Sequence, residues 1–182
     1  AVTVVVGGRF ESWKATDGFN FSASPALSVN QPQVKSDNFS PKASVRWAFL
    51  PEWSAKASIG KAYRYPTVSE LYQAITTGAT LTVPNPNLRP EDALSTEWSL
   101  ERTLEDGSIR LTYFTEDIDD ALISQSAPLV TGSTQLFNYV QNIDKVESRG
   151  VEIVGEKDNV LIQGLSLSGN ITWVDSKTRS EE

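Results

Sequence analysis

The sequence has 182 residues, contains neither cysteine nor histidine, and carries a formal net charge of −7 at pH 7. These absences exclude disulfides, zinc sites of the usual kind, and catalysis by imidazole or thiolate groups. The negative charge and the scattering of the 16 Lys and Arg residues argue against nucleic-acid binding, which needs a clustered basic surface.

Apolar residues mostly alternate with polar ones, and Gly, Pro, Asn, Asp and Ser interrupt the pattern at intervals. Such alternation indicates β-strands with one apolar face. About seven strands are expected, at residues 2–13, 40–49, 53–64, 93–103, 108–118, 146–156 and 162–175. No apolar run approaches the roughly 18 residues of a membrane helix, so any membrane span must be made of strands.

The strand expected at 53–64 shows the alternation most clearly. One face carries Trp53, Ala55, Ala57, Ile59 and Tyr63, interrupted by Lys61, and the other carries Ser54, Lys56, Ser58, Gly60, Ala62 and Arg64. At about 3.3 Å per residue and a tilt of about 45°, the stretch from Trp53 to Tyr63 would cover the roughly 25 Å apolar band of a membrane barrel. Its terminal aromatic residues suit the two membrane interfaces. The same alternation also suits a strand in a soluble sandwich.

The connections between the expected strands alternate between long and short. Residues 14–39, 65–92 and 119–145 form long polar connections, whereas 50–52, 104–107 and 157–161 are short. Long loops should therefore lie on one rim and tight turns on the other, as in outer-membrane barrels. Asp106-Gly107 is a hairpin signal, and Gly107 is expected to supply a positive φ.

Several motifs occur in order along these elements. They are Gly7-Gly8-Arg9-Phe10-Glu11, Phe39-Ser40-Pro41-Lys42, Gly60-Lys61-Ala62-Tyr63-Arg64-Tyr65-Pro66 with Ser69-Glu70-Leu71-Tyr72, Asn85-Pro86-Asn87-Leu88-Arg89-Pro90-Glu91, Tyr113-Phe114 with Asp117-Ile118, Asn138-Tyr139 with Asn142, and Arg149-Gly150-Val151-Glu152. This series resembles the barrel of TonB-dependent outer-membrane receptors, the siderophore and vitamin transporters of Gram-negative bacteria. The resemblance covers nearly the whole chain.

The resemblance implies an all-β chain of antiparallel up-and-down strands, with residues 1–182 forming part of a large transmembrane β-barrel. Barrels of this family have 22 strands around an N-terminal plug, and neither a plug nor a TonB box is recognisable in this sequence. The chain is therefore expected to be a fragment of a receptor in the outer membrane. Its implied partners are a ferric-siderophore or similar small ligand, outer-membrane lipid, and TonB through the missing plug. No enzymatic activity and no cofactor are expected.

The expected extracellular loops supply the candidate substrate-binding residues. These are Arg64, Tyr65, Tyr72, Asn85, Asn87, Phe137 and Tyr139. A structural interpretation competes with this one, because Arg64 and Glu70 could form a charge pair that stabilises the rim. Similarly, the Asn and Pro residues at 84–90 could simply direct the loop into the next strand. Exposed aromatic residues also occur in interface girdles.

The acidic residues Glu116, Asp117, Asp119 and Asp120 could bind a hard cation, but their spacing lacks the Gly and the terminal Glu of a Ca²⁺ loop. Solvated charge is the simpler interpretation, so no metal site is predicted. A different class remains open for the whole chain: a soluble β-sandwich adhesin or carbohydrate-binding module. An outer-membrane enzyme or a passive porin would keep the barrel, but no catalytic set is visible.

Overall fold

The computed structural model describes residues 1–21, 28–78, 80–128, 132 and 136–180. The long strands are β1 (Val2–Ala15), β4 (Val34–Leu50), β5 (Trp53–Arg64), β8 (Glu91–Leu104), β9 (Gly107–Pro128), β10 (Leu136–Lys157) and β11 (Leu167–Arg179). Shorter elements are β2 (Phe19–Asn20), β3 (Val29–Asn30), α1 (Val68–Tyr72), β6 (Ile75–Thr77) and β7 (Thr80–Val83). In this part of the chain, no helix is long and apolar enough to cross a membrane.

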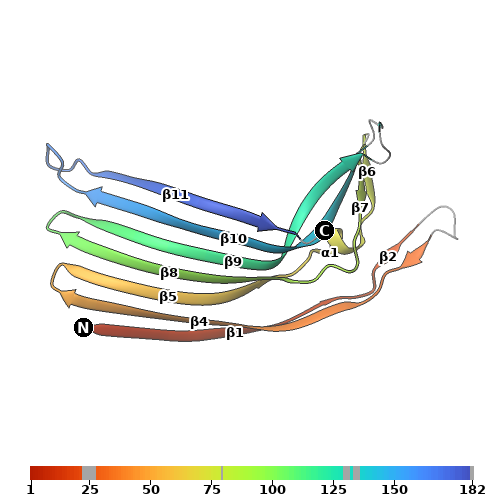
Figure 1. The fold of residues 1–182 in the computed structure, drawn as a ribbon, viewed down its shortest axis with the longest axis horizontal. Coiled ribbons are helices and arrows are strands. Elements are labelled where there is room, and N and C mark those ends of the chain that lie inside the picture. The colour runs from red at the N-terminus through yellow and green to blue at the C-terminus, as the bar shows by residue number, and fades with distance from the viewer. Residues whose placement is uncertain (22–27, 79, 129–131, 133–135, 181–182) are drawn as a thin grey trace.

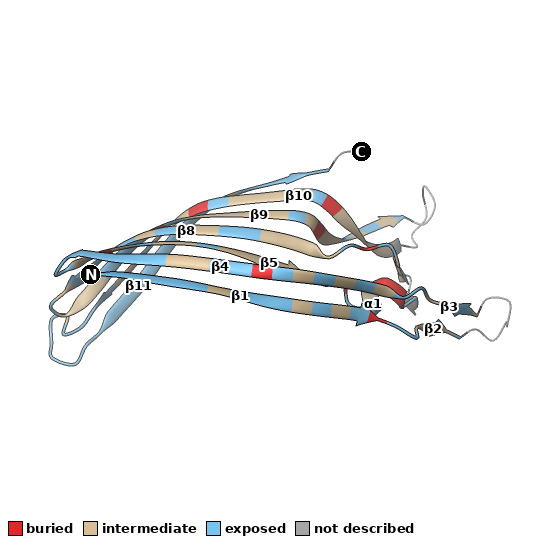
Figure 2. Ribbon diagram, turned by 90° about the horizontal axis from the view of Figure 1, so that it is seen from below, coloured by how far each residue is buried: buried red, intermediate tan, exposed pale blue. Residues whose placement is uncertain are grey.

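The long strands form one antiparallel sheet in the order β1-β4-β5-β8-β9-β10, with β11 on the far side of β10. Figures 1 and 2 show that this sheet is curved and open. The tight connections lie at one end of the sheet and the longer excursions at the other (Figure 1). Both the all-β class and the segregation of short turns from long loops are therefore confirmed.

Three of the expected strand boundaries are wrong because the strands continue past the apolar region. β9 and β10 each have 22 residues and remain paired from Gly107 with Lys157 to Pro128 with Leu136. The predicted loop 119–145 is therefore mostly a projecting hairpin. Likewise, β4 begins at Val34 rather than residue 40. Above an apolar band both faces of a strand can be polar, so the hydrophobic alternation that marks a strand in the sequence disappears.

The turn residues also differ from expectation. β11 begins at Leu167 instead of residue 162, because the preceding segment turns through positive φ at Asn159, Leu161 and Gly164. The prediction for Gly107 is wrong, since it is not among the glycines with positive φ. A Cβ at Gly107 would lie 2.2 Å from the backbone oxygen of Glu156. The close approach of β10, rather than the turn conformation, requires glycine at this position.

The strand register places apolar residues side by side on one face. One such row contains Val2, Trp47, Ala55, Leu100, Leu111, Ile153 and Ile171. These side chains are half-buried to exposed, and within the described residues no second sheet packs on them. A sandwich would bury this face, so the structure does not support the soluble β-sandwich.

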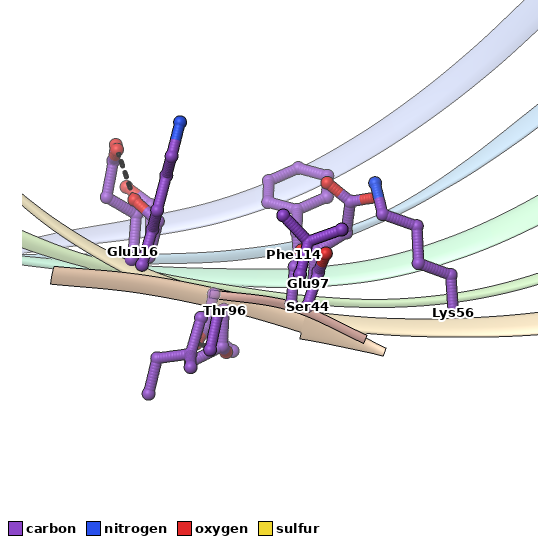
Figure 3. Close-up of a pocket in the computed structure, with 15 residues that line it drawn as sticks. Ser44, Lys56, Thr96, Glu97, Phe114 and Glu116 are labelled. Carbon is purple, nitrogen blue, oxygen red and sulfur yellow. Dashed lines mark hydrogen bonds and ion pairs between the residues drawn. The ribbon is translucent and has the colours of Figure 1, made fainter. Parts of the chain in front are cut away.

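The opposite face is polar. Its corresponding row contains Thr3, Arg46, Lys56, Ser99, Thr112, Glu152 and Thr172. Figure 3 shows Lys56, Glu97 and Phe114 on the side toward which the sheet curves, with Thr96 on the other side. The polar face is therefore concave and the apolar face is convex. The described part of the chain has one buried hydrophobic cluster, which lies at the loop end and contains Ala15, Leu71, Tyr72 and Leu88.

Candidate functional site

Residues 65–90, here named the crossing loop, leave β5 and traverse the concave face. Leu71 and Tyr72 of α1 pack with Ala15 of β1 in the buried cluster. Trp13 and Val34 pack against this cluster. Further along, β7 pairs in parallel with the start of β10, at Leu136–Tyr139. The loop therefore connects the first strands of the sheet to its last strands. Figure 1 shows β6 and β7 beside the projecting ends of β9 and β10.

The crossing loop begins with a network of charged and capping groups. Arg64 contacts Glu70 at 2.9 Å and Glu91 at 3.7 Å. Thr67 and Glu70 form a capping box, in which the Thr67 side chain accepts from the Glu70 N–H and the Glu70 carboxylate accepts from the Thr67 N–H. Because α1 has only five residues, this reciprocal cap satisfies much of its unpaired backbone.

The same contacts determine the pKa of Glu70. Burial alone would raise the pKa of this carboxyl, but hydrogen bonds from the Thr67 N–H and hydroxyl and from Arg64 outweigh it and lower the pKa. The charged form is therefore the one that stabilises the start of the loop.

Tyr65 and Tyr72 attach the crossing loop to the first strands. Tyr65 stacks on Trp13 with ring centroids 5.5 Å apart, and its hydroxyl donates to Asn38 at 3.2 Å. Burial raises the pKa of the Tyr65 hydroxyl. Tyr72 is 4% exposed, and its hydroxyl donates to the Pro32 carbonyl at 2.5 Å. Both rings are therefore engaged in holding the loop.

The segment 85–91 attaches the loop to β9 and β10. Asn85 Nδ2 donates to the Val140 carbonyl at 3.2 Å, and the Asn85 N–H donates to the Glu70 carbonyl at 3.0 Å. Asn85 Oδ1 also accepts from the Asn87 N–H at 3.1 Å, which forms a local turn. Leu88 in the same segment is 3% exposed and belongs to the buried cluster. Hydrogen bonds and apolar packing therefore both hold the segment 85–91 in place.

Asn142 is the central partner of this segment on β10. Its side-chain amide pairs with the backbone of Arg89 and also donates to the Asp120 carbonyl at 2.7 Å. Asp120 has a positive φ of 54° where the β9–β10 pairing is interrupted for one residue, between Ala121 and Asp119, and its carboxylate pairs with the Arg89 side chain. In addition, the Glu91 carboxylate accepts from the Leu122 N–H at 2.9 Å.

Phe137 and Tyr139 lie apart from this network, on the projecting part of β10. Their rings stack with centroids 5.2 Å apart, and the Tyr139 hydroxyl donates to Gln125 at 2.9 Å. Both residues pair with β7 through the backbone. The structure thus places Tyr65, Tyr72, Asn85 and Asn87 in the crossing loop, with Arg64 at the end of β5 beside it. It also brings the β7 segment of the loop against the strand that carries Phe137 and Tyr139. Contact of any of these residues with a solute stays a prediction.

A hollow of about 650 Å³ lies in the concave wall below the crossing loop. Figure 3 shows its polar residues, with Lys56 near Glu97 and Glu116 hydrogen-bonded within the site. The Lys56–Glu97 distance is 3.9 Å, and Ser95 donates to Glu116 at 3.2 Å. Phe114 also lines the hollow. Its ring lies so close to Gly150 that a Cβ at position 150 would be only 2.5 Å from it.

Charge is unevenly distributed over this concave wall. On β4 and β5 the inward positions include Lys42, Arg46, Lys56 and Arg64, whereas those on β8 to β10 include Glu91, Glu97, Glu101, Glu116, Glu152 and Glu156. The second group also includes a cation, Arg110, which lies 4.0 Å from Glu101. Contacts across the boundary are long, as in Arg46–Glu101 at 4.0 Å. One side of the wall is thus basic and the other acidic. A charged molecule on the concave side would encounter opposite fields over the two halves.

The acidic run at 116–120 does not converge on one point. Glu116 faces the concave side, Asp117 lies 3.8 Å from Lys145 on the convex side, and Asp120 pairs with Arg89. Among the described residues, no group of three or more His, Cys, Asp or Glu side chains could hold a metal ion. No arrangement of nucleophile and base is found among the residues of the site.

Sequence reasoning missed the residues that hold the crossing loop in place. Trp13 and Asn38 carry no distinctive signal in the sequence, since their roles depend on partners far away in the chain. Asp120 stands out only as part of the acidic run at 116–120, which does not indicate its contact with Arg89. Asn142 was noticed within a motif, but its role was not inferred. The hydrogen-bonding capacity of the Asn142 amide, together with a proline-bounded segment such as 84–90, would have been the usable signal.

A family model described as TonB dependent receptor-like, beta-barrel matches residues 1–182. The iron-regulated outer membrane virulence protein of Vibrio cholerae serotype O1 is 26% identical over 155 residues, which cover 79% of this chain and 23% of that protein. The chain therefore spans about a quarter of the length of the curated relatives it matches.

Solved structures show the same fold at low identity. The siderophore receptor PirA from Pseudomonas aeruginosa has a TM-score of 0.66 at 21% identity, covering 80% of this chain and 30% of that chain. The FrpB iron transporter from Neisseria meningitidis has a TM-score of 0.64 at 19% identity, covering 97% and 24%. The copper transporter OprC has a TM-score of 0.72 at 13% identity, covering 97% and 27%.

Proposed function

We propose that this chain, which belongs to the TonB-dependent receptor-like β-barrel family, is the wall and loop region of an outer-membrane receptor that imports a ferric-siderophore. Energy would come from TonB through a plug domain in the parent protein. The family is one of receptors and transporters rather than enzymes. The iron-regulated relative and the siderophore receptor among the structural neighbours support iron as the cargo.

The two-faced sheet is the observation that carries this proposal. Its apolar convex face suits lipid, and its charged concave face suits a hydrated interior. Soluble proteins rarely expose an apolar face as large as this one, which extends over all the long strands. The crossing loop then limits the opening at the extracellular rim, where recognition takes place.

The basic half of the concave wall supports an anionic solute. Lys42 and Lys56 both line the hollow, and Arg46 lies directly across from Lys56 in the strand register. A wall with this charge raises the local concentration of an anion, and low-dielectric surroundings strengthen the effect. Ferric-siderophores that carry net negative charge fit this field, whereas a free metal cation would be drawn to the acidic half.

The test is uptake by a strain that lacks the parent gene and carries it on a plasmid, grown under iron limitation. Radiolabelled ferric catecholate, ferric hydroxamate and cupric ion are supplied separately, with and without functional TonB. TonB-dependent accumulation of one ferric complex is expected. Accumulation of copper alone, or uptake that persists without TonB, would overturn the proposal.

A charge-neutralising variant tests whether the basic half of the wall itself contributes to uptake. In the triple variant Lys42→Gln, Arg46→Gln, Lys56→Gln, uptake of an anionic complex should fall on the order of tenfold at low ionic strength and less at high salt. The matched variant Glu97→Gln, Glu101→Gln, Glu116→Gln should not slow uptake. Equal loss in both variants would contradict a specific role for the basic wall.

A further inference from the structure

The apolar band on the convex face runs obliquely to the strands. The row that begins at Tyr63 of β5 continues through Asp92, Asp119 and Lys145 to Arg179 of β11. On β11, however, the last outward aromatic residue is Trp173, in the row of Trp98, Tyr113 and Val151. The upper edge of the band thus falls by about six residues, or roughly 20 Å, from β5 to β11.

This obliqueness gives the orientation of the sheet in a membrane. The four steps between β5 and β11 cover about 19 Å across the strands at about 4.8 Å each. A fall of about 20 Å over that width corresponds to a strand tilt of roughly 45°, close to the 35–45° of membrane barrels. The upper membrane boundary can therefore be drawn from Tyr63 to Trp173, where amphipathic rings prefer to lie.

Beyond this boundary, the convex face of the last two strands is charged. The outer charged patch consists of Lys145, Glu147 and Arg149 on β10 and Asp175, Lys177 and Arg179 on β11. These positions alternate with inward ones such as Ser148 and Ser176, whose hydroxyls lie 2.9 Å apart. At the inferred tilt, Arg149 lies about 1 Å beyond the apolar band, Lys177 about 9 Å and Arg179 about 14 Å, where lipid headgroups begin.

Two carboxylates are shared among the four cations of the patch. Asp175 contacts Arg149 at 3.2 Å and Lys177 at 3.9 Å. Glu147 contacts Lys145 at 3.1 Å and Arg179 at 3.0 Å. Lys145 also lies 3.8 Å from Asp117 of β9. The local excess of positive charge therefore lies at Arg149, Lys177 and Arg179, which share the two carboxylates, although the whole chain carries −7.

The cations are also the outermost members of these pairs. The side chains of Arg149, Lys177 and Arg179 are 59%, 59% and 68% exposed. Their partners Asp175 and Glu147 are only 34% and 31% exposed. Each cation therefore keeps donors directed outward, and the planar guanidinium of arginine matches the geometry of a phosphate.

We propose that the outer charged patch binds the phosphate group of an anionic lipid headgroup in the leaflet on the loop side of the membrane. This inference rests on the proposed outer-membrane location but not on the solute that is transported. Arg149, Lys177 and Arg179 supply the donors, for which Asp175 and Glu147 compete with the phosphate. Trp173 and Val151 contact the upper part of the acyl chains.

The test uses the purified full-length receptor in a neutral detergent, with diphosphoryl lipid A as the probe and phosphatidylcholine for comparison. Bound lipid is counted by native mass spectrometry. The variant Arg149→Gln, Lys177→Gln, Arg179→Gln should bind the diphosphorylated probe on the order of 10-fold to 100-fold more weakly, with phosphatidylcholine unchanged. The inward variant Lys42→Gln, Arg46→Gln, Lys56→Gln removes the same charge and should bind like the wild type.

A second variant gives an opposite and independent result. Removing the competing carboxylates in Glu147→Gln, Asp175→Asn should strengthen binding of the probe severalfold, which misfolding cannot mimic. Equal loss in the outward and inward variants, or weaker binding in the carboxylate variant, would overturn the proposal. Since lipid is counted without any transport step, this outcome is distinguishable from a failed uptake assay.

Discussion

Asn142 and Arg89 are joined by two hydrogen bonds between one side-chain amide and one stretch of backbone. The Arg89 N–H donates to Asn142 Oδ1 at 2.9 Å, and Asn142 Nδ2 donates to the Arg89 carbonyl at 3.0 Å. The amide thus acts as a strand partner and attaches the crossing loop to the β10 hairpin, 53 residues away.

Removing this amide should release the loop. Asn142→Ala leaves the Arg89 N–H and carbonyl and the Asp120 carbonyl without their partner, at a cost of about 1–3 kcal/mol for each group that water cannot reach. Limited proteolysis of the folded receptor should then cut within 65–90 at least tenfold faster. Ser176→Ala, which removes one exposed hydroxyl contact, serves as the control. Unchanged cleavage in Asn142→Ala would show that the loop is held by other contacts.

Acid should destabilise the start of the crossing loop at α1. The folded-state pKa of Glu70 is lowered, so its contribution to stability is fully present above the ordinary carboxyl pKa of about 4.3. It is lost as the pH falls through the lower, folded-state pKa. Hydrogen exchange of the α1 amides, measured between pH 7 and pH 3, should show protection falling in this range. In Glu70→Gln, protection should be lower at pH 7 and should lack this pH-dependent step.

Gly107 should not tolerate a side chain. Gly107→Ala places a Cβ against the Glu156 carbonyl, and relief requires movement of backbone, which costs about 1–3 kcal/mol. Gly155→Ala is the matched control, because a Cβ there meets nothing within 4 Å. Denaturant unfolding of the refolded receptor compares the two variants. Equal unfolding midpoints for the two variants would mean that the backbone around Gly107 and Glu156 can move apart at little cost.

The two faces of β8 should respond differently to the same charge. Leu100→Lys places an ammonium on the convex apolar row and should destabilise the membrane-inserted barrel by about 2 kcal/mol. Ser99→Lys places it one residue away on the concave side, where water is available, and should have little effect. The free energy of unfolding from lipid vesicles decides between these outcomes. If Ser99→Lys were the more costly variant, the face assignment would be reversed.

The candidate solute-binding residues should separate into two groups. Phe137→Ala and Tyr139→Ala should weaken binding of the transported ferric complex with little change in thermal stability, since their rings lie on a projecting hairpin. Arg64→Ala and Tyr72→Ala should lower stability and loosen the loop first, because both side chains are bound within the fold. Calorimetric titration together with thermal unfolding distinguishes the groups. A stable Arg64→Ala variant that no longer binds would instead give Arg64 a direct role.

The sequence by itself determined the features that depend on neighbouring residues. Alternation fixes which side chains of a strand share a face, so the apolar and polar faces of residues 53–64 were predicted correctly. Short polar breaks such as 50–52 likewise located the tight turns. The same local signal failed for residues 119–145, because strands surrounded by water on both faces show no hydrophobic period.

Only the tertiary structure decided how distant segments meet. The path of the crossing loop depends on Trp13, Asn142 and Asp120, whose contacts join positions far apart in the chain. The oblique apolar band also appears only when the register of all the strands is known. Hydrogen-bond pairing between strands sets that register, and it determines that Arg149, Lys177 and Arg179 gather on the convex face beyond Trp173.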